Sequence, residues 1–290
     1  DKSVSRGLGD VYKRQIEHPA VSKVLKEIET YGVEVSTISV NDQGVVKIEE
    51  LIDLIKDETT LVSVMMANNE IGAIQPIKKI KQILKKYEIP LHTDAVQALG
   101  KIKVDVNELD VDYLSLSAHK FYGPKGIGAL YVKNKDDLGS LIIGGNQESG
   151  VRGGTENISG IIGMGLAAEL VTKNQDRWIK NLKKLERYFL KKVEHNLPHA
   201  IHHKTDNLPG LISISFPGKK SNILMAKLDR ADIAVSNGPA CSSGNIQPSS
   251  VLKAIGLSDD VNLSTLRISF GKNNTIEEVD YLIKTLKEIV

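Results

Sequence analysis

Hydrophobic and polar positions follow two different periods along the first half of the chain. Residues 33–40 alternate as a strand, whereas 61–66 is a continuous apolar run, as in a strand buried on both faces. Residues 90–94 form a further short strand. The segments with helical spacing lie between and before these strands, at residues 21–28, 48–55 and 77–87. Strands that alternate with helices predict an α/β fold with a mostly parallel sheet flanked by helices.

The pattern changes in the second half. A hairpin at 113–117 and 127–132 is followed by a glycine-rich loop at 144–157. Helical spacing then predicts one helix over 159–173 and a second over 176–196. The remaining expected elements are strands at 211–216 and 265–270, a helix at 248–255, and a last helix with the capping box Thr275–Glu278. These elements predict a smaller C-terminal α+β domain.

Three segments follow from this reading. Residues 1–15 show no period that fits a core, so we expect an unrelated leader there. Residues 16–172 are expected to form a large cofactor-binding domain, and 173–290 a small C-terminal domain.

Composition narrows the class of protein. The 290 residues are 41% hydrophobic and 26% charged, as in an ordinary globular protein. A net charge of +2 gives no reason to expect nucleic acid or a membrane as the main partner. The sequence has a single cysteine and no signal-peptide pattern, so we expect a reducing, cytoplasmic compartment.

Polar residues follow three of the predicted strands. Asn69, Asp94 and Lys120 each lie at the carboxyl end of a strand, where open α/β sheets bind their ligands. Pyridoxal phosphate needs a lysine for its Schiff base and an acid for its pyridinium nitrogen. Lys120 and Asp94 fit these needs, and Asn69 and Gln97 can donate to the ring oxygen. Lys120 as a surface lysine and Asp94 as a helix N-cap are the alternatives.

Two further segments carry candidate chemistry. The loop at 144–157 is either a linker or a phosphate site, in which backbone amides act with Arg152 and Thr155. Cys241 lies in a run of small, turn-forming residues, where an exposed thiol suits a nucleophile better than a packing role. An incidental surface thiol is the alternative. We expect no metal at either segment.

Five motifs resemble one family when taken in order. They are Ala67–Gly72, His92–Gln97, Ser115–Gly126, Arg152–Thr155 and Ala240–Ser243. From about residue 16 onward the chain resembles cysteine desulfurases of the NifS/IscS type. That resemblance implies the class V aminotransferase fold (pyridoxal-phosphate fold type I) and a homodimer that takes sulfur from L-cysteine and leaves L-alanine.

The resemblance also implies roles around the cofactor. Lys120 would form the Schiff base, and Asp94 would hold the pyridinium nitrogen. His18 would stack on the ring as a catalytic residue. Asn69 and Gln97 would bind the ring oxygen, and Asn69 would also face the substrate.

The remaining roles concern the anionic groups and the sulfur. Ser117 and His119 would hold the cofactor phosphate together with Thr155 from the partner subunit. Arg267 would bind the substrate carboxylate, for which a bidentate guanidinium fits best. Cys241 would take the sulfur as a persulfide. It would then pass the sulfur to an acceptor protein, either an iron-sulfur scaffold or a tRNA-thiolation enzyme.

The family has a segment before the stacking histidine, including a helix-start loop that cradles the phosphate. Residues 1–15 do not match it, so we expect an N-terminally truncated chain. Two alternatives follow. One is a selenocysteine lyase of the same fold, and the other is an inactive truncated fragment or scaffold subunit.

Overall fold

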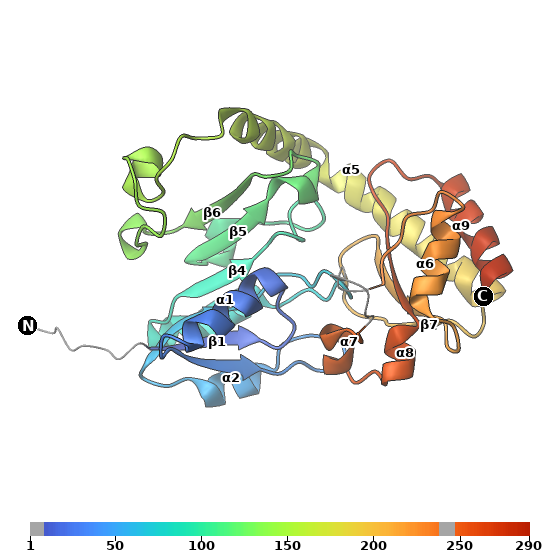
Figure 1. The fold of residues 1–290 in the computed structure, drawn as a ribbon, viewed down its shortest axis with the longest axis horizontal. Helices are drawn as coiled ribbons and strands as arrows, with labels where there is room; N and C mark the ends of the chain where they lie inside the picture. The colour runs from blue at the N-terminus through green and yellow to red at the C-terminus, as the bar shows by residue number, and fades with distance from the viewer. Residues whose placement is uncertain (1–8, 238–246) are drawn as a thin grey trace, which may run out of the picture.

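The computed structural model describes residues 9–237 and 247–290 (Figure 1). They form two units, one around a six-stranded sheet and one around a three-stranded sheet. The elements are β1 (Asp10–Arg14), α1 (Pro19–Glu29), β2 (Glu34–Ile38), α2 (Ile48–Leu54), β3 (Thr59–Ser63), α3 (Ile77–Leu84), η1 (Lys85–Tyr87), β4 (Leu91–Asp94), α4 (Val106–Leu109), β5 (Tyr113–Ser117), η2 (Ala118–Phe121), β6 (Gly128–Val132), η3 (Lys135–Asp137), η4 (Gln147–Gly150), α5 (Ile158–Asn196), β7 (Ile201–His202), β8 (Leu211–Ser215), α6 (Ser221–Asp229), α7 (Ser250–Ala254), α8 (Asp259–Leu263), β9 (Thr265–Ser269) and α9 (Ile276–Ile289).

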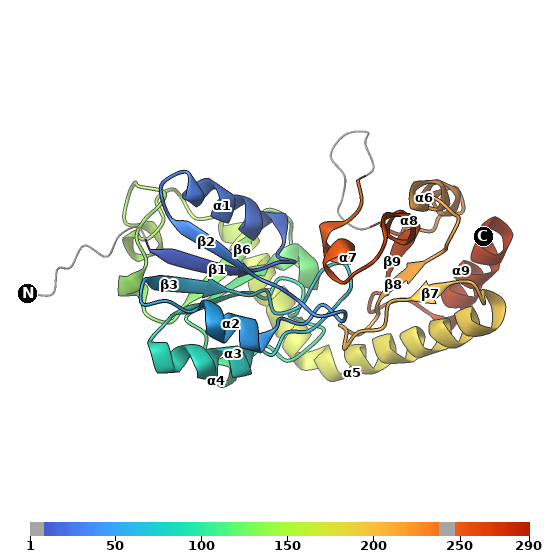
Figure 2. The same ribbon diagram turned by 90° about the horizontal axis from the view of Figure 1, so that it is seen from below.

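The large sheet has the strand order β2-β1-β3-β4-β5-β6. Every neighbouring pair is parallel except β5 and β6, which form the predicted antiparallel hairpin. Figure 2 shows α1 on one side of this sheet and α2, α3 and α4 on the other. Ile77, Ile80 and Leu84 are the buried stripe of α3 and pack into the same core as the buried strand residues. The predicted parallel α/β architecture is confirmed.

The small sheet is antiparallel, with the order β7-β8-β9. Its core joins Ile214 and Leu266 from the strands to Phe189 of α5 and Leu282 of α9. The predicted capping box at the start of α9 is present, with the Thr275 hydroxyl and the Glu278 carboxylate each accepting a backbone N–H.

One helix replaces the two that the sequence predicts over 159–173 and 176–196. α5 runs without a break from Ile158 to Asn196. In the polar stretch near residue 174, side chains bond to carbonyls of the continuous helix: Thr172 Oγ1 donates to Ala168 O at 3.0 Å, and Asn174 Nδ2 to Leu170 O at 2.8 Å. The expected domain boundary at residue 172 therefore falls inside a helix that belongs to both units.

The structure also differs from the expectation for residues 1–15. Asp10–Arg14 forms β1, which lies between β2 and β3 inside the large sheet. In the described part of the chain, the buried side-chain atoms without a hydrogen-bond partner belong to Asp10, Arg14 and Glu17. Parallel backbone pairing thus holds β1 in place, while two of its side chains fit their surroundings poorly.

Candidate active site

The carboxyl ends of β3, β4 and β5 lie side by side and present their polar loops at one edge of the sheet. The backbone fixes this alignment: Met66 N–H donates to Asp94 O at 2.8 Å, and Ala95 N–H to Ser115 O at 3.0 Å. Asn69 follows β3, Asp94 ends β4, and Lys120 lies on η2 directly after β5. The structure therefore places three of the predicted residues on neighbouring segments of one edge.

Asp94 is 7% exposed, with its carboxylate at the end of a central strand. Its Oδ1 accepts the N–H of Val96 at 2.9 Å, within a turn rather than at the start of a helix. The hydrogen bonds of the described residues use Oδ1 alone. Burial lowers the pKa of the neighbouring His92, and the negative charge of Asp94 opposes that change. One oxygen of a buried carboxylate is thus available to a cationic N–H.

The turn that carries Lys120 is held rigidly from both sides. Ser117 Oγ and His119 Nδ1 lie 2.9 Å apart, just before the exposed Lys120. Tyr122 adopts a left-handed conformation with φ of 69°. Its ring contacts Trp178 edge-on at 5.5 Å, and its hydroxyl accepts the N–H of Lys272 at 3.0 Å. The small unit therefore helps to fix the lysine's turn.

Arg267 reaches the same edge from β9 of the small unit. Its Nη1 donates to the backbone carbonyl of Asn69 at 2.9 Å. Burial lowers the pKa of Arg267, and the negative charge of Glu70 opposes that change. A guanidinium held in this way can offer its remaining N–H groups to a carboxylate.

Lys101 was not singled out from the sequence, although it lies close to this cluster. Its Nζ donates to Gln97 Oε1 at 3.5 Å. Burial, together with the positive charges of Arg267 and Lys120, lowers the pKa of Lys101 to about 8. The positive charges of Arg267 and Lys120 therefore act on Lys101, which contacts Gln97. The sequence signal was a lysine directly after Gly100, four residues beyond the predicted Gln97.

Three predicted site residues remain, namely His18, Thr155 and Cys241. His18 is exposed and caps α1, with Nδ1 accepting the N–H of Ala20 at 3.1 Å. Thr155 is exposed on the segment between β6 and α5. Because β6 is antiparallel, that segment leaves the sheet at the opposite edge, as Figure 1 shows. Cys241 lies outside the described residues.

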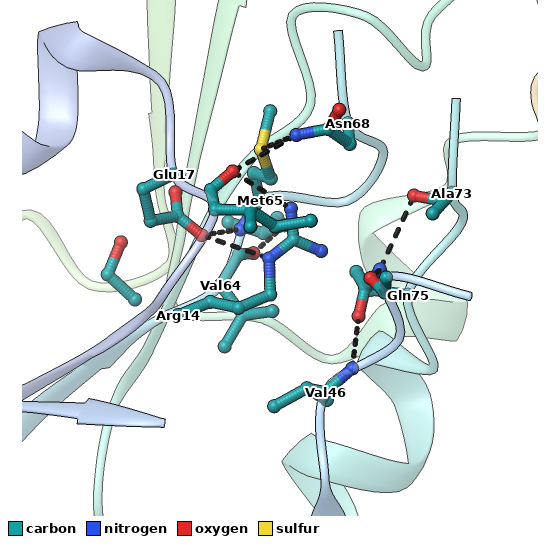
Figure 3. Close-up of polar contacts among 12 residues, drawn as sticks. Arg14, Glu17, Val46, Val64, Met65, Asn68, Ala73 and Gln75 are labelled. Atoms are coloured by element: carbon teal, nitrogen blue, oxygen red, sulfur yellow. Dashed lines mark hydrogen bonds and ion pairs between the residues drawn. The ribbon is translucent and has the colours of Figure 1, made fainter. Parts of the chain in front are cut away.

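A buried network supports the loop after β3 (Figure 3). Glu17 Oε1 accepts the N–H of Met65 at 2.7 Å and lies 3.7 Å from Arg14 Nε. Asn68 Nδ2 donates to Ile16 O at 3.1 Å, while Gln75 Oε1 accepts the N–H of Val46 at 2.9 Å. These bonds fix both ends of the loop that carries Asn69.

The donor set at this edge fits pyridoxal phosphate. It contains a lysine amine, a carboxylate with a free oxygen, a carboxamide, and a serine–histidine pair. The convergence of Lys101, Lys120 and Arg267 also favours anionic ligands. The chemistry of these residues therefore agrees with the predicted cofactor.

Comparisons with known proteins agree with this site. The family model described as aminotransferase class-V matches residues 9–282. The cysteine desulfurase IscS of Clostridium botulinum is 42% identical over 280 residues, covering 95% of this chain and 70% of that protein. The mitochondrial cysteine desulfurase of Saccharomyces cerevisiae is 40% identical over 298 residues, covering 99% and 60%. A solved NifS-like protein matches with a TM-score of 0.90 and 38% identity, covering 97% of this chain and 74% of that one.

The chain belongs to the class V aminotransferase family. Its similarity to curated cysteine desulfurases confirms the resemblance seen in the sequence, and the match to the NifS-like structure confirms the predicted fold type I. Among the described residues, no helix is both long enough and apolar enough to cross a membrane.

Proposed function

We propose that the protein is a pyridoxal-phosphate-dependent cysteine desulfurase, which moves the sulfur of L-cysteine onto Cys241 and releases L-alanine. The observation that carries the proposal is Arg267 Nη1 on the carbonyl of Asn69, at the edge that holds Asp94 and Lys120. A carboxylate on Arg267 would direct the amine and Cα of an amino acid toward Lys120.

Each polar group then has one task. When bound, pyridoxal phosphate supplies a ring that withdraws electrons from the Cα of an attached amino acid. Asp94 would accept the ring N–H, while Gln97 and Asn69 would orient the ring oxygen. Lys120 Nζ would take the proton from Cα and later return a proton to the product.

Cys241 supplies the sulfur acceptor, and this role rests on the sequence. Its thiolate Sγ attacks the substrate sulfur, an S–S bond forms and the substrate C–S bond breaks. The electron pair of the broken bond stays with the carbon, which is protonated as L-alanine is formed. One L-cysteine and one protein thiol thus become one L-alanine and one protein persulfide, without an external oxidant.

The partners follow from the same chemistry. A second copy of the chain would bring Thr155 to the phosphate beside Ser117 and His119, in keeping with the exposure of Thr155 in its own subunit. The persulfide would pass to an acceptor protein, an iron-sulfur scaffold or a tRNA-thiolation enzyme. The proposed role of the protein is therefore sulfur transfer.

The test is incubation of the cofactor-loaded protein with L-cysteine and no reductant. We expect equimolar L-alanine and a mass gain of about 32 daltons, one sulfur atom, on the peptide that contains Cys241. Cys241→Ser should abolish the mass gain and nearly all alanine while keeping the visible absorbance of the cofactor. Lys120→Ala should abolish the visible absorbance of the cofactor in addition to the mass gain and the alanine. Alanine released by Cys241→Ser at the parental rate would contradict the proposal and favour a lyase.

A further inference from the structure

Glu70 is a buried carboxylate that the proposed chemistry does not use. It follows Asn69 in the loop after β3 and is 7% exposed. Its Oε2 accepts the hydroxyl of Ser249 at 2.5 Å, across 179 residues of chain. Its backbone N–H donates to Asn68 Oδ1 at 2.8 Å. Both the backbone and the side chain of Glu70 are therefore fixed.

Ser249 is itself held tightly. Its Oγ accepts the N–H groups of Val251 and Leu252 at 3.1 and 3.3 Å and so caps α7. Its backbone N–H donates to Asn262 Oδ1, and its carbonyl accepts from Asn262 Nδ2, both at 2.8 Å. A hydroxyl with so little freedom is a firm anchor for the Glu70 carboxylate, which links the large unit to the C-terminal part of the chain.

Glu70 and Arg267 also affect each other's pKa. Burial raises the pKa of Glu70, and both the Ser249 hydrogen bond and the positive charge of Arg267 oppose that rise. Arg267 is bonded to the carbonyl of Asn69, the residue next to Glu70. Two consecutive residues of one loop therefore meet two points of the C-terminal part of the chain, Arg267 on β9 and Ser249 at the start of α7.

We propose that Glu70 is a positioning residue for the substrate carboxylate, because its hydrogen bond to Ser249 fixes the guanidinium of Arg267 against the loop after β3. The inference rests on the proposed function, in which Arg267 binds that carboxylate. Glu70 itself contacts no substrate. Its effect arises because a bidentate pair needs the two N–H groups of a guanidinium in one orientation.

The test separates the hydrogen bond from the charge. Glu70→Leu removes the acceptor, Ser249→Gly removes the donor at a helix cap where glycine is well tolerated, and Glu70→Gln keeps an acceptor oxygen. Equilibrium binding of L-alanine to the cofactor-loaded protein is measured by calorimetry, and KM for L-cysteine by alanine release. Cysteamine, which is cysteine without the carboxylate, serves as a competitive inhibitor.

We expect Glu70→Leu and Ser249→Gly to raise the Kd of L-alanine and the KM of L-cysteine about tenfold, the loss of roughly one hydrogen bond. The kcat, the inhibition constant of cysteamine and the affinity for pyridoxal phosphate should stay within about twofold. Glu70→Gln should lie within about threefold of the parent in every constant.

Thr205→Val is the matched control. The Thr205 hydroxyl donates to Ile71 O at 3.2 Å, another hydrogen bond between the same loop and the small unit, without contact to Arg267. This variant should bind L-alanine as the parent does. An equal loss in Thr205→Val would show general loosening of the loop and overturn the proposal.

Two other results would also overturn it. The first is parental L-alanine binding in both Glu70→Leu and Ser249→Gly, and the second is an equal loss of cysteamine binding. A Glu70→Gln variant as weak as Glu70→Leu would refute the role of the hydrogen bond. If the parent itself makes no alanine from cysteine, the proposed function fails instead, which is a distinguishable outcome.

Discussion

Two arginine–glutamate pairs differ in their surroundings, and Arg14, Glu17 and Glu70 are buried whereas Arg267 is half-buried. Arg14 and Glu17 lie 3.7 Å apart with fully buried side chains, and Arg14 Nε and Nη1 and Glu17 Oε2 have no hydrogen-bond partner in the described part of the chain. Arg267 and Glu70 each bond to a third group, the carbonyl of Asn69 and the hydroxyl of Ser249. The first pair also has external hydrogen bonds, from Met65 N–H to Glu17 Oε1 and from Arg14 Nη2 to Ile16 O, but it leaves three buried atoms unpaired, whereas no such atom belongs to the second pair in the described part of the chain.

The comparison shows why residue type does not identify a functional charge. Burial raises the pKa of Glu17 to about 7 and lowers that of Arg14 to about 10, shifts as large as those in many active sites. Yet Arg14 belongs to β1, where the sequence predicted an unrelated leader, and it has no role in the proposed chemistry, although the negative charge of Asp94 opposes the lowering of its pKa. The hydrogen bonds around Arg267 and Glu70, by contrast, direct a guanidinium to the edge of the sheet that carries Lys120.

The largest expected effect is at Arg267. Arg267→Ala should lower kcat/KM for L-cysteine about a thousandfold, because a buried, hydrogen-bonded charge pair with the substrate is lost. Arg267→Lys should recover only part of this activity, since an ammonium cannot make the bidentate contact. Steady-state alanine release measures both, and parental kcat/KM in Arg267→Ala would show that the two pairs do not differ in function.

For the pair Arg14 and Glu17, the prediction concerns the free energy of unfolding. The double variant Arg14→Met with Glu17→Gln should raise the free energy of unfolding by about 3 kcal/mol at pH 8, because two poorly compensated buried charges are removed. The carboxamide introduced by Glu17→Gln would retain an acceptor for the Met65 N–H. Chemical denaturation of the cofactor-free protein measures the change. A loss of stability would mean that the ion pair is a net stabilising contact.

The sequence predicted the parts of this comparison unequally. Asn69, Asp94 and Lys120 could be located because each follows a strand, and parallel strands end at a common edge. Their roles stay predictions, as do those of His18, Gln97, Ser117, His119, Thr155, Arg267 and Cys241. The importance of Glu70 could not be predicted, because it depends on a contact with Ser249, 179 residues away.

Two features of the fold were not predicted from the sequence. Helical spacing predicted two helices, over 159–173 and 176–196, but α5 continues between them, where the Asn174 side chain bonds back to the helix. The role of Asp10–Arg14 as a strand was not expected, because residues 1–15 show no period that fits a core. Neighbouring strands supply its backbone partners on both sides, and that tertiary pairing outweighs the local pattern.

Glu17 should also give stability a pH dependence of its own. Its pKa is raised to about 7 in the folded protein, so between about pH 4.5 and 7 the folded state holds a proton that the unfolded state has lost. Stability should therefore fall as the pH rises through this window. Glu17→Gln should match the parent near pH 4.5 and exceed it by about 2 kcal/mol at pH 8. Parallel stability curves for the two proteins would contradict the raised pKa.

The smallest expected effect is at Lys101, a half-buried cation whose pKa responds to Arg267 and Lys120. Like Arg14 it is penalised in the folded protein, because burial, Arg267 and Lys120 lower its pKa to about 8. In the cofactor-free protein, Lys101→Met should therefore add about 1 kcal/mol of stability below pH 8, a figure reduced for partial solvent screening. The gain should disappear as the pH rises toward 10.5, since the unfolded lysine then also loses its proton.

Unlike Arg14, however, Lys101 lies where an anionic ligand is expected. Saturating pyridoxal phosphate should thus raise the unfolding midpoint of the parent more than that of Lys101→Met, and leave the difference between the parent and the Arg14→Met, Glu17→Gln variant unchanged. Equal ligand-induced shifts in the parent and Lys101→Met would mean that the charge of Lys101 is as idle as that of Arg14.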